Sequence, residues 1–216
     1  MKFNIITIFP QVLDAYFNES ILKRAQEKNI VQINSLNLRD WTFDKHHSVD
    51  DTPYGGGAGM VMRVDVIHAA LKDIVSNQGA KKTILLSAKG KKWDQQLAKK
   101  YSKLEEVNII CGRYEGVDER VTKFIDDEIS IGDYVLTGGE IGAMVIVDSV
   151  TRLLPGVLGN KVSLESESHN KPGQLEYAQY TRPEIFVADE KKYRVPKVLL
   201  SGNHKEIEEW KTSKKK

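Results

Sequence analysis

Short β-branched runs alternate with amphipathic stretches along the first 155 residues, and this pattern predicts an α/β fold. Apolar positions at helical spacing predict helices between the runs, with Asn18 and Asp65 as the N-caps of the first two. Strand, helix and strand in succession are typical of a parallel sheet. The predicted strands are residues 2–9, 31–38, 83–87 and 107–111, and the predicted helices are residues 19–29, 66–75 and 93–101.

A polar segment without clear periodicity, residues 40–63, follows the second predicted strand and is rich in glycine near residues 55–59. It lacks the Gly-Lys-Ser/Thr ending of a Walker loop, which argues against a nucleoside-triphosphate site. His46 and His47 are adjacent and have no third spaced ligand, so a metal site is disfavoured. Long loops are often functional. The segment is therefore either a lid or nucleic-acid-contacting loop, or a plain surface loop.

Glycine is concentrated in residues 109–142, where a short helix at 117–125 and a short strand at 128–131 are predicted. Glycine costs about 0.5–1 kcal/mol inside regular structure, so the cluster marks either a ligand site or a set of tight turns. Ligands of open α/β sheets bind beyond the carboxyl ends of the strands. Residues 87–90 and 112–116 are therefore candidate walls of one site.

The helix predicted at residues 140–154 is apolar on nearly all sides and stops before Pro155. Such a helix lies in a core or in a subunit interface, so a homodimer is a hypothesis. Asp148 and Arg152 lie four residues apart on one face of it. An intrahelical ion pair and a functional arginine both stay open as interpretations.

Composition narrows the class of protein. A net charge of +2 is too small for a protein that coats polyanions, yet lysines cluster near residues 81–103, 191–197 and 214–216. These clusters either follow phosphates or form a solvated face. No apolar run approaches the roughly 20 residues that span a bilayer, and the single cysteine excludes an intrachain disulfide. We therefore expect a cytoplasmic protein without a membrane partner.

The dinucleotide fingerprint G-x-G-x-x-G is missing after the first strand, which argues against hydride transfer. A ligand without phosphates, such as S-adenosylmethionine, fits better because it needs close backbone approach and an apolar slot. Cys111 is an alternative reactive centre as a covalent nucleophile. Its place at the end of an apolar strand favours an inert buried thiol.

Six ordered motifs resemble the bacterial tRNA (guanine-N1)-methyltransferase family of the SPOUT superfamily, and together they extend over nearly the whole chain. They are DTPYGGGAGMVM at residues 51–62, CGRYEGVDER at 111–120, SIGDYVLTGGE at 130–140, RLLPGVLGN at 152–160, YTRPE at 180–184 and VLLSGNH at 198–204. The family assignment rests on these motifs and their order.

The resemblance implies a SPOUT-type parallel sheet with a C-terminal trefoil knot, a rare feature that general topology rules would not predict. Residues 1–159 would form the knotted α/β methyltransferase domain and residues 160–174 an interdomain linker that carries the catalytic base. Residues 175–216 would form a small helical C-terminal domain, shortened by a helix or two relative to the family. The resemblance also implies a homodimer with its sites at the interface.

The implied reaction transfers a methyl group from S-adenosylmethionine to N1 of the guanosine 3′ of the anticodon in tRNA. Whether Mg²⁺ acts as a catalytic helper stays open, and no metal ligands are predicted. By position in the motifs, the residues implied to bind the methyl donor are Leu85, Leu86, Ser87, Gly112, Tyr114, Glu115, Gly116, Ser130, Ile131, Gly132, Asp133, Tyr134, Val135, Leu136, Gly138 and Gly139.

Guanine N1 carries a proton at neutral pH, so its methylation needs a base, and a cation must stabilise charge on O6. Arg152 matches the family's arginine for the second role and suits the O6 edge. Glu167 stands where the family has an aspartate base and is one methylene longer. The implied substrate contacts are Asp51, Tyr54, Gly57 and His169.

The chain departs from the family pattern at three places. Ala88 and Gly142 stand where proline is usual, and Glu167 lies in an altered Ser-Glu-Ser-His segment. The altered segment motivates an alternative, an RNA-binding SPOUT protein with lost or changed methyltransferase activity. The shortened C-terminal domain predicts weaker tRNA affinity, with a steep salt dependence through the lysine clusters.

Overall fold

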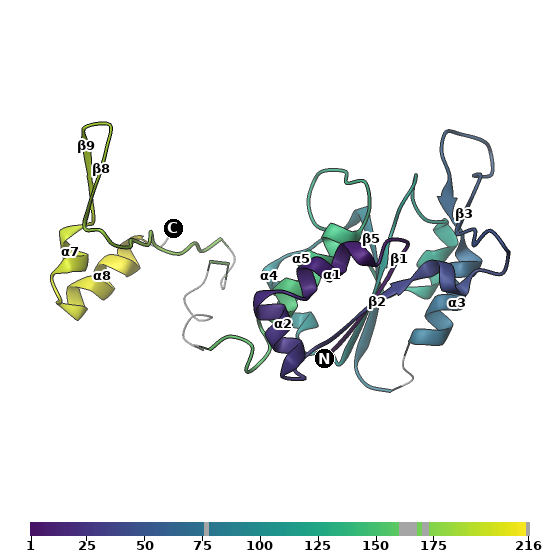
Figure 1. Cartoon of the computed structure of the whole chain (residues 1–216), viewed down its shortest axis with the longest axis horizontal. Coiled ribbons are helices and arrows are strands. Elements are labelled where there is room, and N and C mark those ends of the chain that lie inside the picture. Colours follow the sequence, from purple (N-terminus) through teal and green to yellow (C-terminus); the bar gives the residue numbers. More distant parts are fainter. Residues whose placement is uncertain (76–77, 160–167, 170–172, 215–216) are drawn as a thin grey trace. The chain divides into compact units, whose positions relative to one another are not determined.

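The computed structural model describes residues 1–75, 78–159, 168–169 and 173–214. The chain divides into two compact units, Met1–Gly159 and Asn160–Lys216 (Figure 1). Within the described ranges, no helix has both the length and the apolar character needed to cross a membrane.

The first unit is built on a five-stranded parallel sheet in the order β2-β1-β6-β5-β7, with helices on both faces (Figure 1). A second, two-stranded sheet pairs β3 with β4 in antiparallel fashion. The elements are β1 Lys2–Thr7, α1 Gln11–Phe17, α2 Ser20–Glu27, β2 Gln32–Asn37, the 3-10 helix η1 Leu38–Trp41, β3 Asp50–Asp51, β4 Val61–Met62, α3 Val64–Ile74, β5 Lys81–Lys92, α4 Gln95–Tyr101, β6 Glu106–Cys111, the 3-10 helix η2 Glu119–Phe124, β7 Asp127–Ser130 and α5 Glu140–Thr151.

The central strands are buried on both faces. Alternate side chains point to opposite sides of the sheet, and helices cover each side. Ile5 and Ile109, paired in register, belong to the cluster that α1, α2, α4 and α5 cover. Ile6 and Ile110, one residue further along, belong to the cluster that α3, η1 and η2 cover. The continuous apolar runs of the sequence therefore become the middle layer of the unit.

The start of the first helical region differs from the prediction. Helix α1 lies between Pro10 and Asn18, so Asn18 closes this helix instead of capping the next one, which begins at Ser20. Two buried residues four apart, Leu13 and Phe17, anchor α1 to the core. At α3, Asp65 lies in the first turn and pairs with the N-cap residue Arg63 at 2.6 Å.

Strand β5 extends past the predicted end at residue 87 through a lysine-rich stretch that the sequence suggests as a loop. The register shifts between Leu86 and Lys91, after which Lys91 pairs with Ile129 and Lys92 with Ser130. A side chain at Gly90 would collide with the backbone of Ile129. The length of β5 is therefore set by its pairing with β7. The charged lysines are compatible with this pairing.

The segment predicted as one long loop is partly ordered into strands. Asp50 pairs with Met62 and Asp51 with Val61, so the residues between them form a protruding loop beside β3 (Figure 1).

The second unit contains a hairpin as well as helices, and its elements are β8 Ile185–Ala188, β9 Lys191–Arg194, α7 Lys197–Leu200 and α8 His204–Lys214. The sequence predicts a mostly helical appendage and misses this hairpin. Asp189 and Glu190 both have positive φ, 47° and 62°, as the two central residues of a type I′ turn require. Trp210 of α8 contacts the rings of Tyr177 and Tyr180.

Candidate functional site

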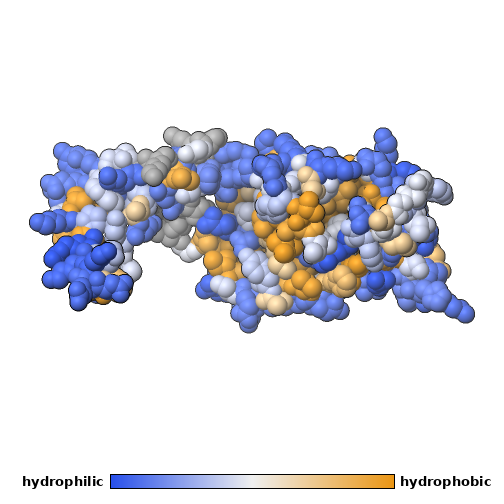
Figure 2. All heavy atoms as spheres, turned by 90° about the horizontal axis from the view of Figure 1, so that it is seen from above, coloured by the Kyte–Doolittle hydropathy of each residue, from blue (hydrophilic) through white to orange (hydrophobic). Residues whose placement is uncertain are grey.

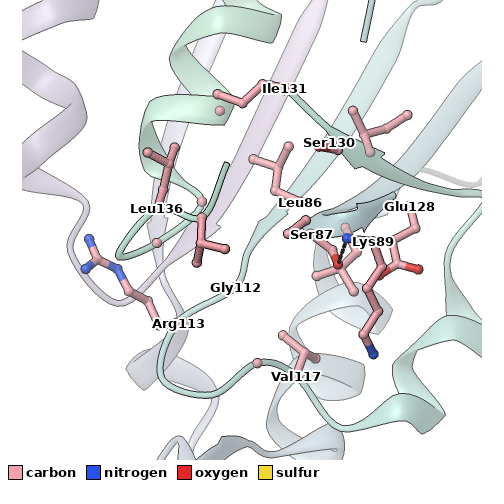
Figure 3. Close-up of a pocket in the computed structure, with 18 of the residues that line it drawn as sticks. Leu86, Ser87, Lys89, Gly112, Arg113, Val117, Glu128, Ser130, Ile131 and Leu136 are labelled. Atoms are coloured by element: carbon pink, nitrogen blue, oxygen red, sulfur yellow. Dashed lines mark hydrogen bonds between the residues drawn. The ribbon is translucent and has the colours of Figure 1, made fainter. Parts of the chain in front are cut away.

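A cavity of about 280 Å³ lies beside the irregular part of β5 around Ser87 and beyond the carboxyl ends of β6 and β7 (Figure 3). Both segments predicted as candidate walls of one site contribute to it. The implied methyl-donor residues that line it are Leu85, Leu86, Ser87, Gly112, Tyr114, Glu115, Gly116, Ser130, Ile131, Gly132, Tyr134, Val135, Leu136, Gly138 and Gly139. The remaining one, Asp133, is outside the lining; its carboxylate is exposed and pairs with Lys92 at 2.6 Å.

The two ends of the cavity differ in polarity. Leu86, Ile131 and Leu136 lie around one end, whereas Ser87, Lys89 and Glu128 lie around the other (Figure 3). The hydroxyl of Ser87 accepts a hydrogen bond from the backbone N–H of Lys89 at 3.2 Å. The cavity therefore offers an apolar slot next to a polar end, which suits a ligand that has both kinds of surface.

Some of the glycines serve close backbone packing. A Cβ on Gly139 would lie 2.7 Å from the Cα of Cys111, and the N–H of Gly139 donates to the carbonyl of Gly112 at 3.0 Å. A side chain on Gly138 would collide with the guanidinium of Arg113. These two glycines let the start of α5 pack directly on the end of β6. This packing role of Gly138 and Gly139 is distinct from both the ligand and the turn interpretation of the glycine cluster.

A buried ion pair, not predicted from the sequence, fixes the same junction. The carboxylate of Glu140, only 2% exposed, accepts hydrogen bonds from Arg113 Nε at 3.0–3.1 Å and from Thr7 Oγ1 at 2.6 Å. The guanidinium of Arg113 also donates to the carbonyl of Thr137 and lies over the ring of Phe9. A glutamate at the first position of an otherwise apolar helix is the signal that could have indicated this network.

The glycine-rich loop between β3 and β4 is tied to the cavity wall by its backbone. Glu115 N–H donates to Met60 O at 3.0 Å, Met62 N–H to Gly116 O at 2.9 Å, and Asp118 N–H to Met62 O at 3.0 Å. Two motifs about fifty positions apart in sequence, residues 51–62 and 111–120, therefore form one surface.

The implied substrate residues of this loop lie on its protruding part. Asp51 is exposed, Tyr54 is fully exposed, and Gly57 has a φ of 134° with no close packing beyond Pro53. Where the loop meets the wall, Tyr114 has a left-handed φ of 59°, a conformation that costs about 1–3 kcal/mol in a non-glycine residue. Burial and the neighbouring Asp50 raise the pKa of Tyr114.

Of the two implied catalytic residues, the structure describes Arg152 but not Glu167. Arg152 is the C-cap of α5, and its N–H donates to the carbonyl of Asp148 at 3.1 Å. The carboxylate of Asp148 accepts a hydrogen bond from Tyr16 of α1, and this bond raises the pKa of Tyr16 to about 12. Glu167 lies outside the described residues. His169 belongs to the second unit, where its N–H donates to Gln174 O at 2.6 Å.

Cys111 has the properties of an inert thiol. It is fully buried, and burial raises its pKa well above the ordinary value. Since the thiolate is the reactive form, covalent catalysis by Cys111 is disfavoured. Among the described residues, no group of three or more His, Cys, Asp or Glu side chains is placed to hold a metal ion.

Two of the departures from the family pattern lie in the cavity wall. Ala88 and Gly142 both line it. A Cβ at Gly142 would be 3.2 Å from a methyl carbon of Leu86. Glycine at 142 therefore leaves room for the present position of Leu86.

Comparison with known proteins gives consistent matches over the chain. A sequence model of the family described as tRNA (Guanine-1)-methyltransferase TrmD matches residues 1–216. A tRNA (guanine-N(1)-)-methyltransferase of Carboxydothermus hydrogenoformans is 56% identical over 211 residues, covering 97% of this chain and 81% of the relative. Proteins of the same name from Citrifermentans bemidjiense and Mycoplasmopsis synoviae are 54% and 51% identical, covering 97% and 98% of this chain and 83% and 90% of the relatives.

Proposed function

The chain belongs to the tRNA (guanine-1)-methyltransferase family, and from this premise we propose how its own residues carry out the reaction. It is an enzyme that methylates N1 of guanine in tRNA. We propose that the target is the guanosine 3′ of the anticodon, as the motifs imply. The observation that supports this mechanism best is the cavity, where strand β5 and two segments remote from it in sequence contribute implied methyl-donor residues. The alternative of a binding protein without activity is not favoured, because the relatives are named as enzymes.

S-adenosylmethionine is the methyl donor that the family implies, and when bound it supplies an electrophilic methyl group on sulfur. The cavity fits such a molecule. Leu86, Ile131 and Leu136 offer apolar surface to an adenine ring, and the backbone of residues 130–139 offers peptide groups to its polar edge. The polar end with Ser87 suits the charged amino-acid part. Gly116, where an added Cβ would meet no atom within 4 Å, permits close approach.

We assign the chemistry on guanine to Arg152 and Glu167. A guanidinium at O6 stabilises the negative charge that develops when N1 loses its proton. Arg152 occupies the end of α5, whose first turn borders the cavity through Gly142. Glu167 accepts the N1 proton as general base, a role in which reach matters before pKa. Asp51, Tyr54, Gly57 and His169 hold the tRNA.

Glu167→Gln tests the assignment of the base. We expect kcat on a tRNA transcript to fall about 10²–10⁴-fold, because glutamine cannot accept the proton. Binding of S-adenosylmethionine, measured by calorimetry, should stay unchanged, since no residue of the donor cavity is altered. Glu165→Gln, two positions away, is the matched control. Equal turnover of Glu167→Gln and wild type would remove Glu167 from the mechanism, and His169 would be the next residue to substitute.

We propose a homodimer with α1 and α5 in the interface. Helix α5 buries Ala143, Ile146 and Val147 in the core but leaves Ile141 54% and Val145 40% exposed. Val12 and Tyr16 of α1 are 50% and 42% exposed. Figure 2 shows apolar side chains gathered on one face of the first unit, over the region where α1 and α5 lie in Figure 1. A second copy of the chain would bury these side chains.

Sedimentation experiments measure the oligomeric state of the chain directly. The wild type should sediment as a dimer, and Ile141→Lys should shift it to monomer because a buried unpaired charge is costly. Phe124→Lys, at an exposed apolar position of η2 beside the other face of the sheet, should leave the dimer intact. A monomeric wild type would contradict the proposal.

The trefoil knot is proposed for the segment that contains the cavity. Its support is the close approach of backbones remote in sequence, since Gly139 packs on Cys111 and Gly90 on Ile129 with no room for a side chain. An experimental density map that traces residues 84–142 without a crossing would overturn it.

The remaining proposals concern organisation and setting. Residues 160–174 act as a linker that carries Glu167, and residues 175–216 form the tRNA-binding domain. We place the enzyme in the cytoplasm, where tRNA is modified. A role for Mg²⁺ as a helper would appear as loss of turnover with a chelator and recovery on adding Mg²⁺.

A further inference from the structure

The β8–β9 hairpin presents two faces of different character. Paired residues of an antiparallel ladder share a face, so Phe186 and Tyr193 lie together on one side, with Lys191 two positions away on the same side. The opposite face carries Ile185, Val187, Lys192 and Arg194 by the same rule. The hairpin therefore has an aromatic face with one cation, and an aliphatic face that also carries two cations.

The aromatic rings are available to a partner. Phe186 is 57% and Tyr193 is 56% exposed, and their ring centroids are 6.3 Å apart with the planes tilted by 35°. Aromatic pairs of this kind normally gain stability from burial. Here more than half of each side chain stays open to solvent, within a unit in which none of the described residues is buried.

Positive charge is concentrated around the same strand. Residues 191–197 contain four Lys or Arg and no acidic residue. Residues 160–216 carry 12 Lys and Arg against 9 Asp and Glu, a net charge of +3, whereas residues 1–159 carry 20 against 21, a net charge of −1. By net charge, a polyanionic partner is thus attracted more strongly to the second unit than to the first.

We propose that the aromatic face of the hairpin, Phe186 and Tyr193 with Lys191, stacks on unpaired bases of the tRNA substrate. The proposal rests on the proposed function, which makes tRNA the partner. Exposed rings next to cations are the means by which proteins hold single-stranded RNA, since rings stack on bases and cations neutralise phosphates. A membrane surface fits less well, because Asp189 and Glu190 occupy the tip of the hairpin and would meet anionic lipid first.

The test compares tRNA binding by full-length variants, measured as Kd by filter binding. The double variant Phe186→Leu with Tyr193→Leu keeps apolar area and removes both rings, and we expect Kd to rise about tenfold or more. Phe186→Tyr with Tyr193→Phe keeps both rings and should bind like the wild type. Ile185→Ala with Val187→Ala, on the aliphatic face, is the matched control and should change Kd by less than about threefold.

Kinetics and salt dependence give a second readout. With the rings removed, KM for tRNA should rise while kcat at saturating tRNA stays unchanged, because the hairpin positions no reacting atom. Lys191→Ala should lower the slope of log Kd against log salt by about one.

The outcomes separate this proposal from the proposed function. A wild-type Kd in the double leucine variant overturns the hairpin proposal even if methylation proceeds. Equal weakening in the ring-exchange or aliphatic-face variant also overturns it, because the hairpin would then act only through its fold. Ring-dependent tRNA binding by a wild type that methylates no tRNA would support the hairpin proposal and sink the proposed function. Ring-dependent binding to anionic vesicles, with tRNA binding unaffected, would assign the face to a membrane.

Discussion

The two units of the chain bury their side chains to very different extents. The first unit has fully buried clusters on both faces of its sheet, whereas no described residue of the second unit is buried. A cavity that holds a small molecule needs walls fixed by packing, and the first unit supplies them. A surface that binds a large flexible polyanion such as RNA needs exposed aromatic rings and cations, and the second unit has both. The difference indicates that the buried cores that stabilise the fold lie in the first unit, and it fits the proposal that the second unit adds an exposed surface for RNA.

Removing the second unit gives the largest expected effect. A chain cut after Gly159 should lose tRNA methylation completely, because Glu167 and the basic hairpin are gone. The fragment should still unfold cooperatively and bind S-adenosylmethionine, since both buried clusters and the cavity lie within it. Thermal melting and calorimetry check this. A fragment that fails to fold would show that the first unit depends on the second.

A core substitution tests where the stability resides. Ile109→Ala should lower the unfolding free energy by about 2–5 kcal/mol, because this fully buried side chain leaves a cavity. Leu200→Ala, at a position 48% exposed in the second unit, should change it by about 0.5 kcal/mol or less. Denaturant titration measures both. Similar losses in the two variants would remove the contrast between the units.

Breaking the buried Arg113–Glu140 pair at the start of α5 should lower the unfolding free energy more than breaking the exposed Lys92–Asp133 pair. Glu140→Gln should lower the unfolding free energy by about 2–4 kcal/mol, because the neutral glutamine keeps only one acceptor oxygen for the guanidinium of Arg113. The affinity for S-adenosylmethionine should fall with it, as Gly138 and Gly139 lose their support. Asp133→Asn breaks the exposed pair with Lys92 and should cost under about 1 kcal/mol. A large loss of donor affinity in Asp133→Asn would instead show that Asp133 contacts the donor.

The smallest effect is the pH dependence of one wall residue. The hydrogen-bonded Arg120 guanidinium lowers the pKa of Asp118, whose carboxylate also accepts from Arg120 N–H at 2.9 Å. A lowered pKa means that the stabilisation is complete above the unfolded value of about 3.9 and is lost as pH falls through the folded value. At pH 7 the unfolding free energy of the wild type should exceed that of Asp118→Asn by under about 1 kcal/mol, and the difference should begin to fall only as pH drops below about 4. Denaturant midpoints from pH 3 to 7 measure it; a difference that grows on acidification would contradict the assignment.

The sequence predicts the elements that rest on strong local patterns. Strands β1, β2 and β6 and helix α5 lie where the apolar runs and the helical periodicity predict them. Helix α1 is missed because seven residues between a proline and an asparagine carry only two buried positions. The β8–β9 hairpin is missed because its turn residues, Asp189 and Glu190, are not the Asn-Gly or Asp-Gly pair that usually signals one.

The candidate site also divides into features that the sequence predicts and features that it misses. All the residues that the motif resemblance implies as methyl-donor contacts line the cavity except Asp133, but others that line it, such as Arg113 and Glu128, are not among them. The Arg113–Glu140–Thr7 network and the backbone bonds from Met60 and Met62 to the wall are not predicted. They join residues far apart in the chain, and no local pattern records which distant side chain supplies a partner.

By itself, the sequence determines an α/β chain with a glycine-rich site segment and a basic C-terminal part, because hydrophobic periodicity and composition are local properties. It also determines the family, through six motifs in order. Only the tertiary structure decides which glycines pack backbone on backbone, how far β5 runs, and which ring pair stays exposed on the hairpin. Those features depend on close approach between segments that are remote in the chain, where steric exclusion and strand pairing override local preference.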